Sequence, residues 1–445
     1  MTEDFPIIVH AVRTNAKVMT GSRDDYQPLM SLIGDSRFVL LGEASHGTHD
    51  FYETRARITE QLIAEKGFRT VAVEADWPDA YRANRYAEGR SDDPAAVEAL
   101  SGFKRFPTWM WRNTDVVEFI EWLRDYNEHL PGGARKAGFY GLDLYSLHAS
   151  ARAVLDYLDK VDPEAAKRAR YRYSCFENFG EDPQTYGYAT SFGLSKSCED
   201  EAVAQLVEMQ KRSTEVLKQD GKIDPEDYFY AEQNARVVKD AERYYREMFG
   251  SRVSSWNLRD QHMVETLEAL VSHLGGNSAK VVVWAHNSHL GDARATDMGA
   301  QGELNVGQLV RQNHRDSAVL VGFTTYTGTV TAASNWDAPA ERKWVRPALN
   351  DSYEALFHHT GIPNFLLTLR GNDWISGVLR RQRLERAIGV IYLPESERLS
   401  HYFGARLSQQ FDAVIHMDNT RAVEPLERSA EWNAGEPPET YPFAV

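Results

Sequence analysis

The chain has 445 residues, of which 42% are hydrophobic and 26% charged, as in ordinary globular proteins that bury a large core. Its formal net charge of −15 at pH 7 and the lack of a long basic stretch argue against a nucleic-acid or anionic-membrane partner. No run of about 18 apolar residues is present, so no transmembrane helix is predicted. The opening MTEDFPIIVHAV has no signal-peptide pattern, and Cys175 and Cys198 fit no disulfide framework or zinc motif, so we expect a cytoplasmic protein with reduced thiols.

Short apolar runs, rich in β-branched residues, predict buried strands along the chain. They lie at 38–41, 70–73, 138–142, 280–284, 318–323, 388–393 and 411–415. Helical patterns separate the first of these runs. Such alternation favours an α/β architecture with a mainly parallel sheet flanked by helices.

Residues 150–275 follow a different pattern, in which two long charged stretches with helical periodicity flank a loop. We interpret this block as a helical insertion that packs near the strand ends and covers one edge of the sheet like a lid. The chain is thereby divided into three segments. Residues 1–149 and 276–445 are the two parts of an α/β catalytic core, and 150–275 are the insertion.

The stretch LGEASHGTHDF at 41–51 concentrates ionisable residues directly after the first predicted strand. A helix is predicted to begin near Thr48, a favourable N-cap residue. Glu43 and His46 therefore fall on a strand-to-helix loop. Ligands of open parallel sheets bind outside the carboxyl ends of strands, so this loop is a candidate part of an active site.

Ionisable residues follow three further predicted strands in the same way. Glu74 comes directly after an apolar run, Asp143 ends another, and His286 and His289 follow the strand at 280–284. The carboxyl ends of parallel strands share one edge of a sheet. We therefore expect these side chains to converge with those of the first loop in one cleft.

Arg55 lies on the apolar stripe of the first predicted helix, with Phe51 and Ile58. A guanidinium on a core-facing stripe requires a partner, because an unpaired buried charge is costly. We expect Arg55 to pair with Glu43 or Glu74 beneath the cleft.

Several common catalytic motifs are absent from the sequence. It contains no G-x-S-x-G, Walker A or G-x-G-x-x-G, and Ser45 directly precedes His46, a poor geometry for a serine–histidine dyad. Histidines with carboxylates remain, and they favour general-base activation of water. One histidine takes the proton from water, a carboxylate orients its ring, and a second histidine or the arginine stabilises the developing oxyanion.

The same residues leave a metal-dependent mechanism open. The pairs Glu43-x-x-His46 and His286-x-x-His289, together with Glu74, could supply a histidine–carboxylate shell for a metal ion. Their spacing is looser than H-E-x-x-H, and neither pair clearly lies on a helix. The main interpretation therefore has no metal and no cofactor.

Aromatic residues near the predicted strand ends are candidates for substrate contact. Trp77 and Tyr145 follow the strand-end acids by three and two residues, and Trp109 and Trp111 lie in FPTWMW, which indicates a loop with exposed rings. Amphipathic rings suit a glycoside- or polyketide-like ligand, although the two loop tryptophans could equally belong to the core. The candidate substrate-binding residues are Trp77, Trp109, Asp143 and Tyr145.

Four stretches resemble the erythromycin esterase family. They are LGEASHGTHDFYETRARITEQLI, GFRTVAVEADWPDAYRANRY, GLDLYSLH and VVVWAHNSHLGDAR, and the likeness continues through GELNVGQLVR, ERAIGVIYLPESERLSHYF and QFDAVIHMDNTRAVEPL. The resemblance therefore covers most of the chain. The segments ASHGTHDF and EADWPDA look more like a broad branch, related to proteins described as succinoglycan biosynthesis proteins, than like the macrolide-resistance branch.

The resemblance implies a carboxylic ester hydrolase that cleaves an ester or lactone without a metal ion; in the antibiotic-resistance members this is a macrolide lactone. Carried over onto this sequence, the site comprises a general base, two carboxylates, their buried arginine partner and two histidines across the cleft: His46, Glu43 and Glu74, Arg55, and His286 and His289. The expected partner is a small-molecule substrate, and the oligomeric state stays open. A more distant group binds haem without catalysing hydrolysis, so histidine ligation of iron is the non-enzymatic alternative.

Overall fold

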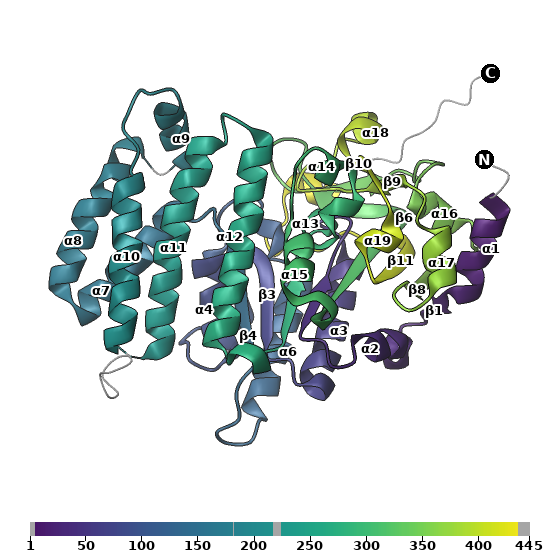
Figure 1. The fold of residues 1–445 in the computed structure, drawn as a ribbon, viewed down its shortest axis with the longest axis horizontal. Coiled ribbons are helices and arrows are strands. Elements are labelled where there is room, and N and C mark those ends of the chain that lie inside the picture. Colours follow the sequence, from purple (N-terminus) through teal and green to yellow (C-terminus); the bar gives the residue numbers. More distant parts are fainter. Residues whose placement is uncertain (1–4, 181, 217–223, 435–445) are drawn as a thin grey trace.

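The structure is a computed structural model that describes residues 5–180, 182–216 and 224–434. A sheet runs through the middle of the molecule, and helices cover both of its faces (Figure 1). Within these residues, no helix combines the length and the apolar character needed to cross a membrane.

The main sheet has nine strands in the described residues, in the order β1-β8-β11-β6-β2-β5-β3-β4, with β7 paired to β6. The strands from β11 to β4 run parallel, whereas β1, β7 and β8 join antiparallel. The strands are β1 (Lys17–Val18), β2 (Phe38–Leu41), β3 (Thr70–Asp76), β4 (Gly138–Asp143), β5 (Val281–Trp284), β6 (Ala318–Ala332), β7 (Glu341–Val345), β8 (Asn364–Thr368) and β11 (Ala413–Thr420), and β9 (Arg383–Arg386) pairs β10 (Tyr402–Ala405) separately. The predicted α/β class with a mainly parallel sheet is confirmed.

The central strand β2 is buried on both faces. Phe38 and Leu40 enter one hydrophobic layer and Val39 and Leu41 the other. The layer of Leu41 is covered by α2 (Gln27–Ile33), α3 (His49–Lys66) and α6 (Thr114–Glu128). The layer of Phe38 is covered by α1 (Phe5–Asn15), α12 (Arg252–His273), α15 (Val306–His314) and α16 (Tyr353–His358).

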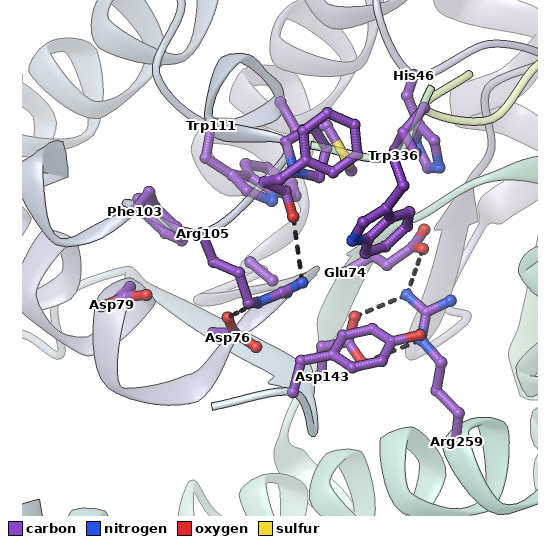
Figure 2. A pocket seen from close by; sticks show the side chains of 16 residues that line it. His46, Glu74, Asp76, Asp79, Phe103, Arg105, Trp111, Asp143, Arg259 and Trp336 are labelled. Atoms are coloured by element: carbon purple, nitrogen blue, oxygen red, sulfur yellow. Dashed lines mark hydrogen bonds and ion pairs between the residues drawn. The ribbon is translucent and has the colours of Figure 1, made fainter. Parts of the chain in front are cut away.

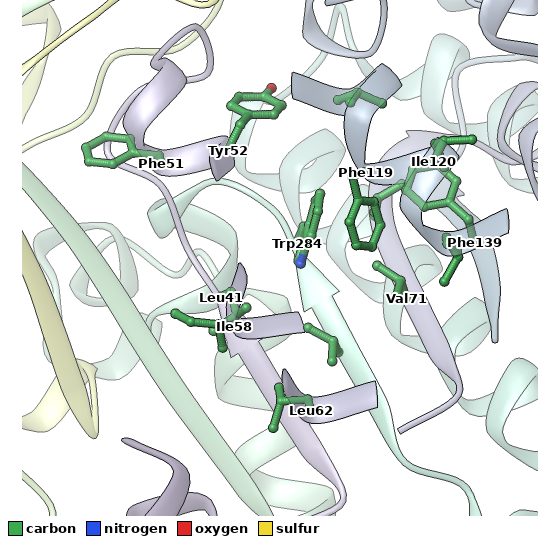
Figure 3. Close-up of a cluster of buried hydrophobic side chains, with 14 of the residues drawn as sticks. Leu41, Phe51, Tyr52, Ile58, Leu62, Val71, Phe119, Ile120, Phe139 and Trp284 are labelled. Atoms are coloured by element: carbon green, nitrogen blue, oxygen red, sulfur yellow. The ribbon is translucent and has the colours of Figure 1, made fainter. Parts of the chain in front are cut away.

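Figure 3 shows the hydrophobic layer that contains Leu41. Ile58 and Leu62 of α3 lie over the strands, beside Trp284 at the end of β5. Phe119 of α6 packs against Trp284 with 4.7 Å between the ring centroids. The large rings fill the space near the carboxyl end of β5, directly beneath the candidate site.

The block between β4 and β5 is helical in its described part, as expected. Its helices are α7 (Leu147–Val161), α8 (Pro163–Tyr173), α9 (Pro183–Ser191), α10 (Glu199–Val216), α11 (Pro225–Glu247) and α12. Helices α7 to α11 share a hydrophobic cluster and stand beside the β4 edge, whereas α12 packs on the sheet (Figure 1). The division into three segments and the role as a lid stay predictions.

The other helices are short, apart from α4 at the end of β3. They are α4 (Trp77–Ala87), α5 (Ala96–Ala99), α13 (Asn287–Leu290), α14 (Asp297–Ala300), α17 (Asp373–Val378), α18 (Glu397–Ser400), α19 (Leu407–Gln410) and α20 (Ala430–Ala434).

The predicted strand at 388–393 is wrong. This segment makes only isolated β-bridges, from Ile388 to Ser45 and from Ile391 to Ala333. The amide of Ile388 donates to the Ala44 carbonyl at 2.8 Å, so the segment crosses over the loop that follows β2. Ile388 and Tyr392 are buried against Val330 and Ala332 of β6 and Val345 of β7, so the segment covers side chains of these strands without continuing their hydrogen-bonded pairing.

The two cysteines also differ from the expectation of reduced thiols, because Cys175 and Cys198 form a disulfide. Cys175 lies in the 3₁₀ helix Ser174–Phe179, and Cys198 directly precedes α10. The fold of the helical block brings these two segments together across 23 residues of sequence. Neither the number nor the spacing of the cysteines could reveal that proximity.

Candidate active site

The loop between β2 and α3 is fixed by close backbone packing. A Cβ atom on Gly47 would come within 1.8 Å of the Thr331 carbonyl oxygen in β6, so glycine is required there. Thr48 occupies the N-cap position of α3, as predicted, but its hydroxyl bonds to that of Ser45 and does not cap the helix. Ser45 is fully buried in this contact, which removes it as a candidate nucleophile.

Glu43 connects His46 to Arg55 beneath the loop. Its Oε1 lies 2.9 Å from Nδ1 of His46, and its Oε2 lies 2.7 Å from Nη2 of Arg55. All three side chains are buried, and the guanidinium lies 4.4 Å from the ring centroid of Tyr52 and 5.2 Å from that of Trp284. The expected pairing of Arg55 with a carboxylate is present, and its partner is Glu43.

Glu74, near the end of β3, pairs with a different arginine. Arg259 on α12 donates from Nη2 to Oε1 of Glu74 at 2.7 Å and binds Asp143 through Nε and Nη2 at 3.0 and 2.6 Å. Burial opposes ionisation of Glu74, but His289 and Arg259 outweigh it and hold the pKa of Glu74 well below its usual value. The pKa of Asp143 is likewise lowered, because Arg259 outweighs its burial.

His289 is enclosed by charged groups. Its Nδ1 lies 2.9 Å from the carboxylate of Asp260, and its Nε2 lies 3.4 Å from Glu74 and 3.1 Å from Arg259. Trp256 stacks on the ring at a centroid distance of 4.5 Å. Burial lowers the pKa of His289, but the carboxylates of Asp260 and Glu74 outweigh it and raise the pKa to about 9. His289 therefore carries a proton at neutral pH.

His286 has the opposite character. Its backbone amide donates to Oε2 of Glu74 at 2.9 Å, and its Nδ1 accepts from the amide of Ser288 at 3.2 Å. Burial, followed by repulsion from the protonated form of His46, lowers the pKa of His286 to about 3. The ring is therefore neutral with its proton on Nε2, and its centroid lies 4.9 Å from that of His46.

Two cavities meet at His46, Glu74 and Arg259, which line both of them. The smaller cavity, of about 200 Å³, also contains Asp143 (Figure 2). The larger cavity, of about 520 Å³, is bounded by His286, His289 and the segment around residue 389. The strand-end side chains therefore converge as expected, with Glu43 and Arg55 beneath them.

Two of the four aromatic candidates do not line a cavity near His46. Trp77 begins α4, and its ring is buried against α11, where Nε1 donates to a backbone carbonyl at 3.3 Å. Trp109 lies in the hydrophobic layer below the sheet, because the turn at 108–110 directs it inward. Trp111 and Tyr145 line the smaller cavity, together with Trp336, which no sequence motif indicated.

Asp79, in the first turn of α4, lies in the smaller cavity without a partner. No hydrogen bond or ion pair joins its carboxylate to another residue in the described part of the chain. Burial, followed by the negative charge of Asp76, raises the pKa of Asp79 from 3.8 to about 7. The folded state therefore binds the proton of the Asp79 carboxyl more tightly than the unfolded chain does. The free energy of unfolding consequently falls as the pH rises from about 4 to about 7.

Replacing Asp79 with asparagine is expected to stabilise the protein at pH 8. The wild type has lost the proton there, so the variant removes an uncompensated charge, and the difference in melting temperature should shrink as the pH falls towards about 4. Thermal unfolding of Asp79→Asn, wild type and the exposed control Asp125→Asn at several pH values tests this. A difference that stays constant with pH would contradict it.

Comparison with known sequences identifies the family to which the chain belongs. A sequence model of the family described as erythromycin esterase matches residues 63–420. The chain belongs to the erythromycin esterase family. The matched range contains Glu74, Arg259 and His289 and begins after the loop of Glu43 and His46, so the placement of those two rests on the geometry above.

Two known relatives of this erythromycin esterase family member are similar over most of their length. The putative hydrolase YbfO of Bacillus subtilis (strain 168) is 22% identical over 420 residues, which cover 89% of this chain and 87% of YbfO. Erythromycin esterase type II of Escherichia coli is 23% identical over 322 residues, which cover 69% of this chain and 74% of that enzyme. Family membership supports a hydrolase of this type.

Solved structures show the same fold. A succinoglycan biosynthesis protein aligns with a TM-score of 0.76 at 22% identity, covering 95% of this chain and 99% of that chain. A Bacillus cereus protein aligns with a TM-score of 0.77 at 19% identity, covering 96% and 100%. A variant of the erythromycin esterase EreC in its open conformation aligns with a TM-score of 0.67 at 15% identity, covering 92% and 96%.

Proposed function

We propose that this erythromycin esterase family member hydrolyses an ester or lactone through a water molecule activated by His46, without a metal ion. The observation that carries the proposal is the chain of contacts from Arg55 through Glu43 to His46, which ends where the two cavities meet. A base at this junction can act on a bond whose acyl and alcohol parts occupy different cavities.

Glu43 determines which nitrogen of His46 acts as the base. Its carboxylate accepts from Nδ1–H, so Nε2 carries the lone pair. Nε2 takes a proton from water as the water oxygen attacks the carbonyl carbon, and the resulting imidazolium is stabilised by Glu43. The imidazolium then returns the proton to the leaving oxygen as the carbon–oxygen bond breaks, and an acid and an alcohol are released.

His286 and Arg259 are the proposed stabilisers of the developing oxyanion. His286 is neutral with its proton on Nε2, and Arg259 supplies a guanidinium whose side chain is 14% exposed. Glu74 binds both of them, through the amide of His286 and Nη2 of Arg259. We therefore assign Glu74 as a positioning residue for both oxyanion donors.

The donor set favours this mechanism over the metal-dependent alternative. In the described residues, no group of three or more His, Cys, Asp or Glu side chains is arranged to hold a metal ion. Arg259 already supplies a cation between Glu74, Asp143 and His289. The Nδ1 atoms of His46 and His289 are bound to carboxylates, so neither offers that nitrogen to a metal.

Treatment with EDTA is expected to leave hydrolysis unchanged, because this mechanism uses only side chains. The measurement is kcat/KM before and after chelation and dialysis, with zinc and manganese added back and the metal content determined. Loss of activity on chelation, restored by zinc, would show that a metal ion, and not Arg259, stabilises the developing oxyanion. Haem titration of the same samples, followed at the Soret band, tests the iron-binding alternative.

The substrate class is found by assaying a panel of acyclic esters, small lactones and macrolide lactones. Macrolides belong in the panel because two of the similar proteins are named erythromycin esterases. Hydrolysis by the wild type, with loss in His46→Ala, identifies the substrates of this site. A protein that cleaves no member of the panel would count against the proposal.

A further inference from the structure

The smaller cavity carries more negative than positive charge. Four carboxylates and two guanidiniums line it: Glu74, Asp76, Asp79 and Asp143, with Arg105 and Arg259. Arg259 binds Glu74 and Asp143, whereas Asp76 and Asp79 lie towards the other side of the cavity from His46 in Figure 2. Among the described residues, Arg105 is the one cation on the wall of that second end.

Asp76 is only partly satisfied by Arg105. Its Oδ2 accepts from Nε of Arg105 at 2.9 Å, whereas its buried Oδ1 has no hydrogen-bond partner among the described residues. Asp76 is 5% exposed and the Arg105 side chain is 41% exposed, so solvent screens the guanidinium more than the carboxylate. A buried carboxylate whose charge is only partly compensated is costly, and a cation in the adjoining cavity gains the corresponding electrostatic free energy.

The cations that surround Asp79 do not neutralise it. Arg82 is held by Asp93, through Nε at 3.1 Å and Nη2 at 2.5 Å. Lys104 is exposed to solvent, and Arg105 is already bound to Asp76. The two aspartates therefore share one partly exposed guanidinium, and one negative charge is left over at this end.

Aromatic rings complete the wall of this cavity: Phe103, Phe106, Trp111, Tyr145 and Trp336. Ring faces attract cations, and the guanidinium of Arg105 already lies 4.6 Å from the ring centroid of Tyr145. The cavity volume of about 200 Å³ is below the roughly 300–1,000 Å³ of sites that enclose a whole drug-sized ligand. The space therefore suits one group of a larger substrate.

We propose that this end of the cavity, formed by Asp76, Asp79 and the surrounding rings, binds a positively charged amine of the substrate. The inference rests on the proposed hydrolase function and names its substrate class, namely esters or lactones that carry an ammonium group. The ammonium group supplies a counter-charge to both carboxylates and a cation for the ring faces. A neutral hydroxyl group would leave the negative charge uncompensated.

The test compares choline with its neutral isostere 3,3-dimethylbutan-1-ol by titration calorimetry at pH 8. We expect choline to bind the wild type at least about tenfold more tightly, a preference consistent with a desolvated cation–π and carboxylate site. Asp79→Asn should remove most of this preference while the affinity for the isostere stays the same. No described residue forms a hydrogen bond or ion pair with the Asp79 carboxylate, so this variant should keep its fold. Asp125→Asn on the solvent side of α6 is the matched control.

Equal affinity for choline and its isostere in the wild type would overturn the inference, as would an undiminished preference in Asp79→Asn. These binding measurements need no hydrolysis, so the two proposals can fail separately. Tight choline binding without cleavage of any ester would support the amine site and count against the hydrolase. Hydrolysis with equal kcat/KM for a choline ester and its 3,3-dimethylbutyl counterpart would support the hydrolase and count against the amine site.

Discussion

Replacing His46 with alanine is expected to abolish hydrolysis while the fold stays intact. A positioned general base contributes about 10²–10⁴-fold to the rate, and the variant also loses the group that holds the attacking water. The side chain lies at the junction of two cavities and, among the residues that the structure describes, makes one side-chain hydrogen bond, to Glu43. Its removal should therefore change the melting temperature far less than the rate. The measurement is kcat/KM and thermal unfolding on the same preparations.

His49 provides the matched control for this variant. It lies three residues further on, binds Asp115 at 2.7 Å and lines neither of the two cavities at His46. His49→Ala should retain hydrolysis, and added imidazole should restore part of the activity of His46→Ala alone. Full activity in His46→Ala would exclude its role as the base.

Replacing Arg55 with alanine is expected to lower the free energy of unfolding by about 3–5 kcal/mol, the range observed when one partner of a buried ion pair is removed. Both Arg55 and Glu43 are about 1% exposed, so the remaining carboxylate has no access to water. Hydrolysis should fall as well, because Glu43 also orients His46. Denaturant unfolding and kcat/KM measure the two effects.

Arg57 is the control on the same helix. Its side chain is 44% exposed and pairs with Glu53 at 2.6 Å, so Arg57→Ala should cost less than about 1 kcal/mol. The double variant Glu43→Gln with Arg55→Met should recover much of the lost stability but not the activity, because it removes the uncompensated charge and the orienting carboxylate together. A similar loss of stability for Arg55→Ala and Arg57→Ala would show that the buried pair has no special role.

The sheet and the strand-end residues could be predicted because their signals are local. Apolar runs such as 38–41 and 281–284 mark buried parallel strands, and an acid or histidine at the next position then lies at a known edge. The strands β7 and β9 could not be predicted, because ERKWV and RLER contain charged residues and no continuous apolar run. Their place depends on pairing with β6 and β10, which a local pattern does not encode.

The side chains that α12 contributes could not be predicted for a related reason. Trp256, Arg259 and Asp260 lie in a charged helical stretch that resembles a solvated face. They are functional candidates only because α12 packs its first turns against the strand ends and brings Arg259 to Glu74. The direction of Trp77 was missed for the same kind of reason, because it depends on the position of α11.

The order of the strands also constrains how the chain can fold during its synthesis. The central strand β2 has β5 and β6 as its neighbours, and both lie beyond residue 280 in the sequence. While the nascent chain leaves the ribosome, only β3 and β4 of the parallel sheet can pair early, and β2 waits for partners more than 200 residues away. Such long-range pairing is slow and exposes apolar strands in the meantime. Synthesis of this chain should therefore depend on chaperones until its last third has emerged.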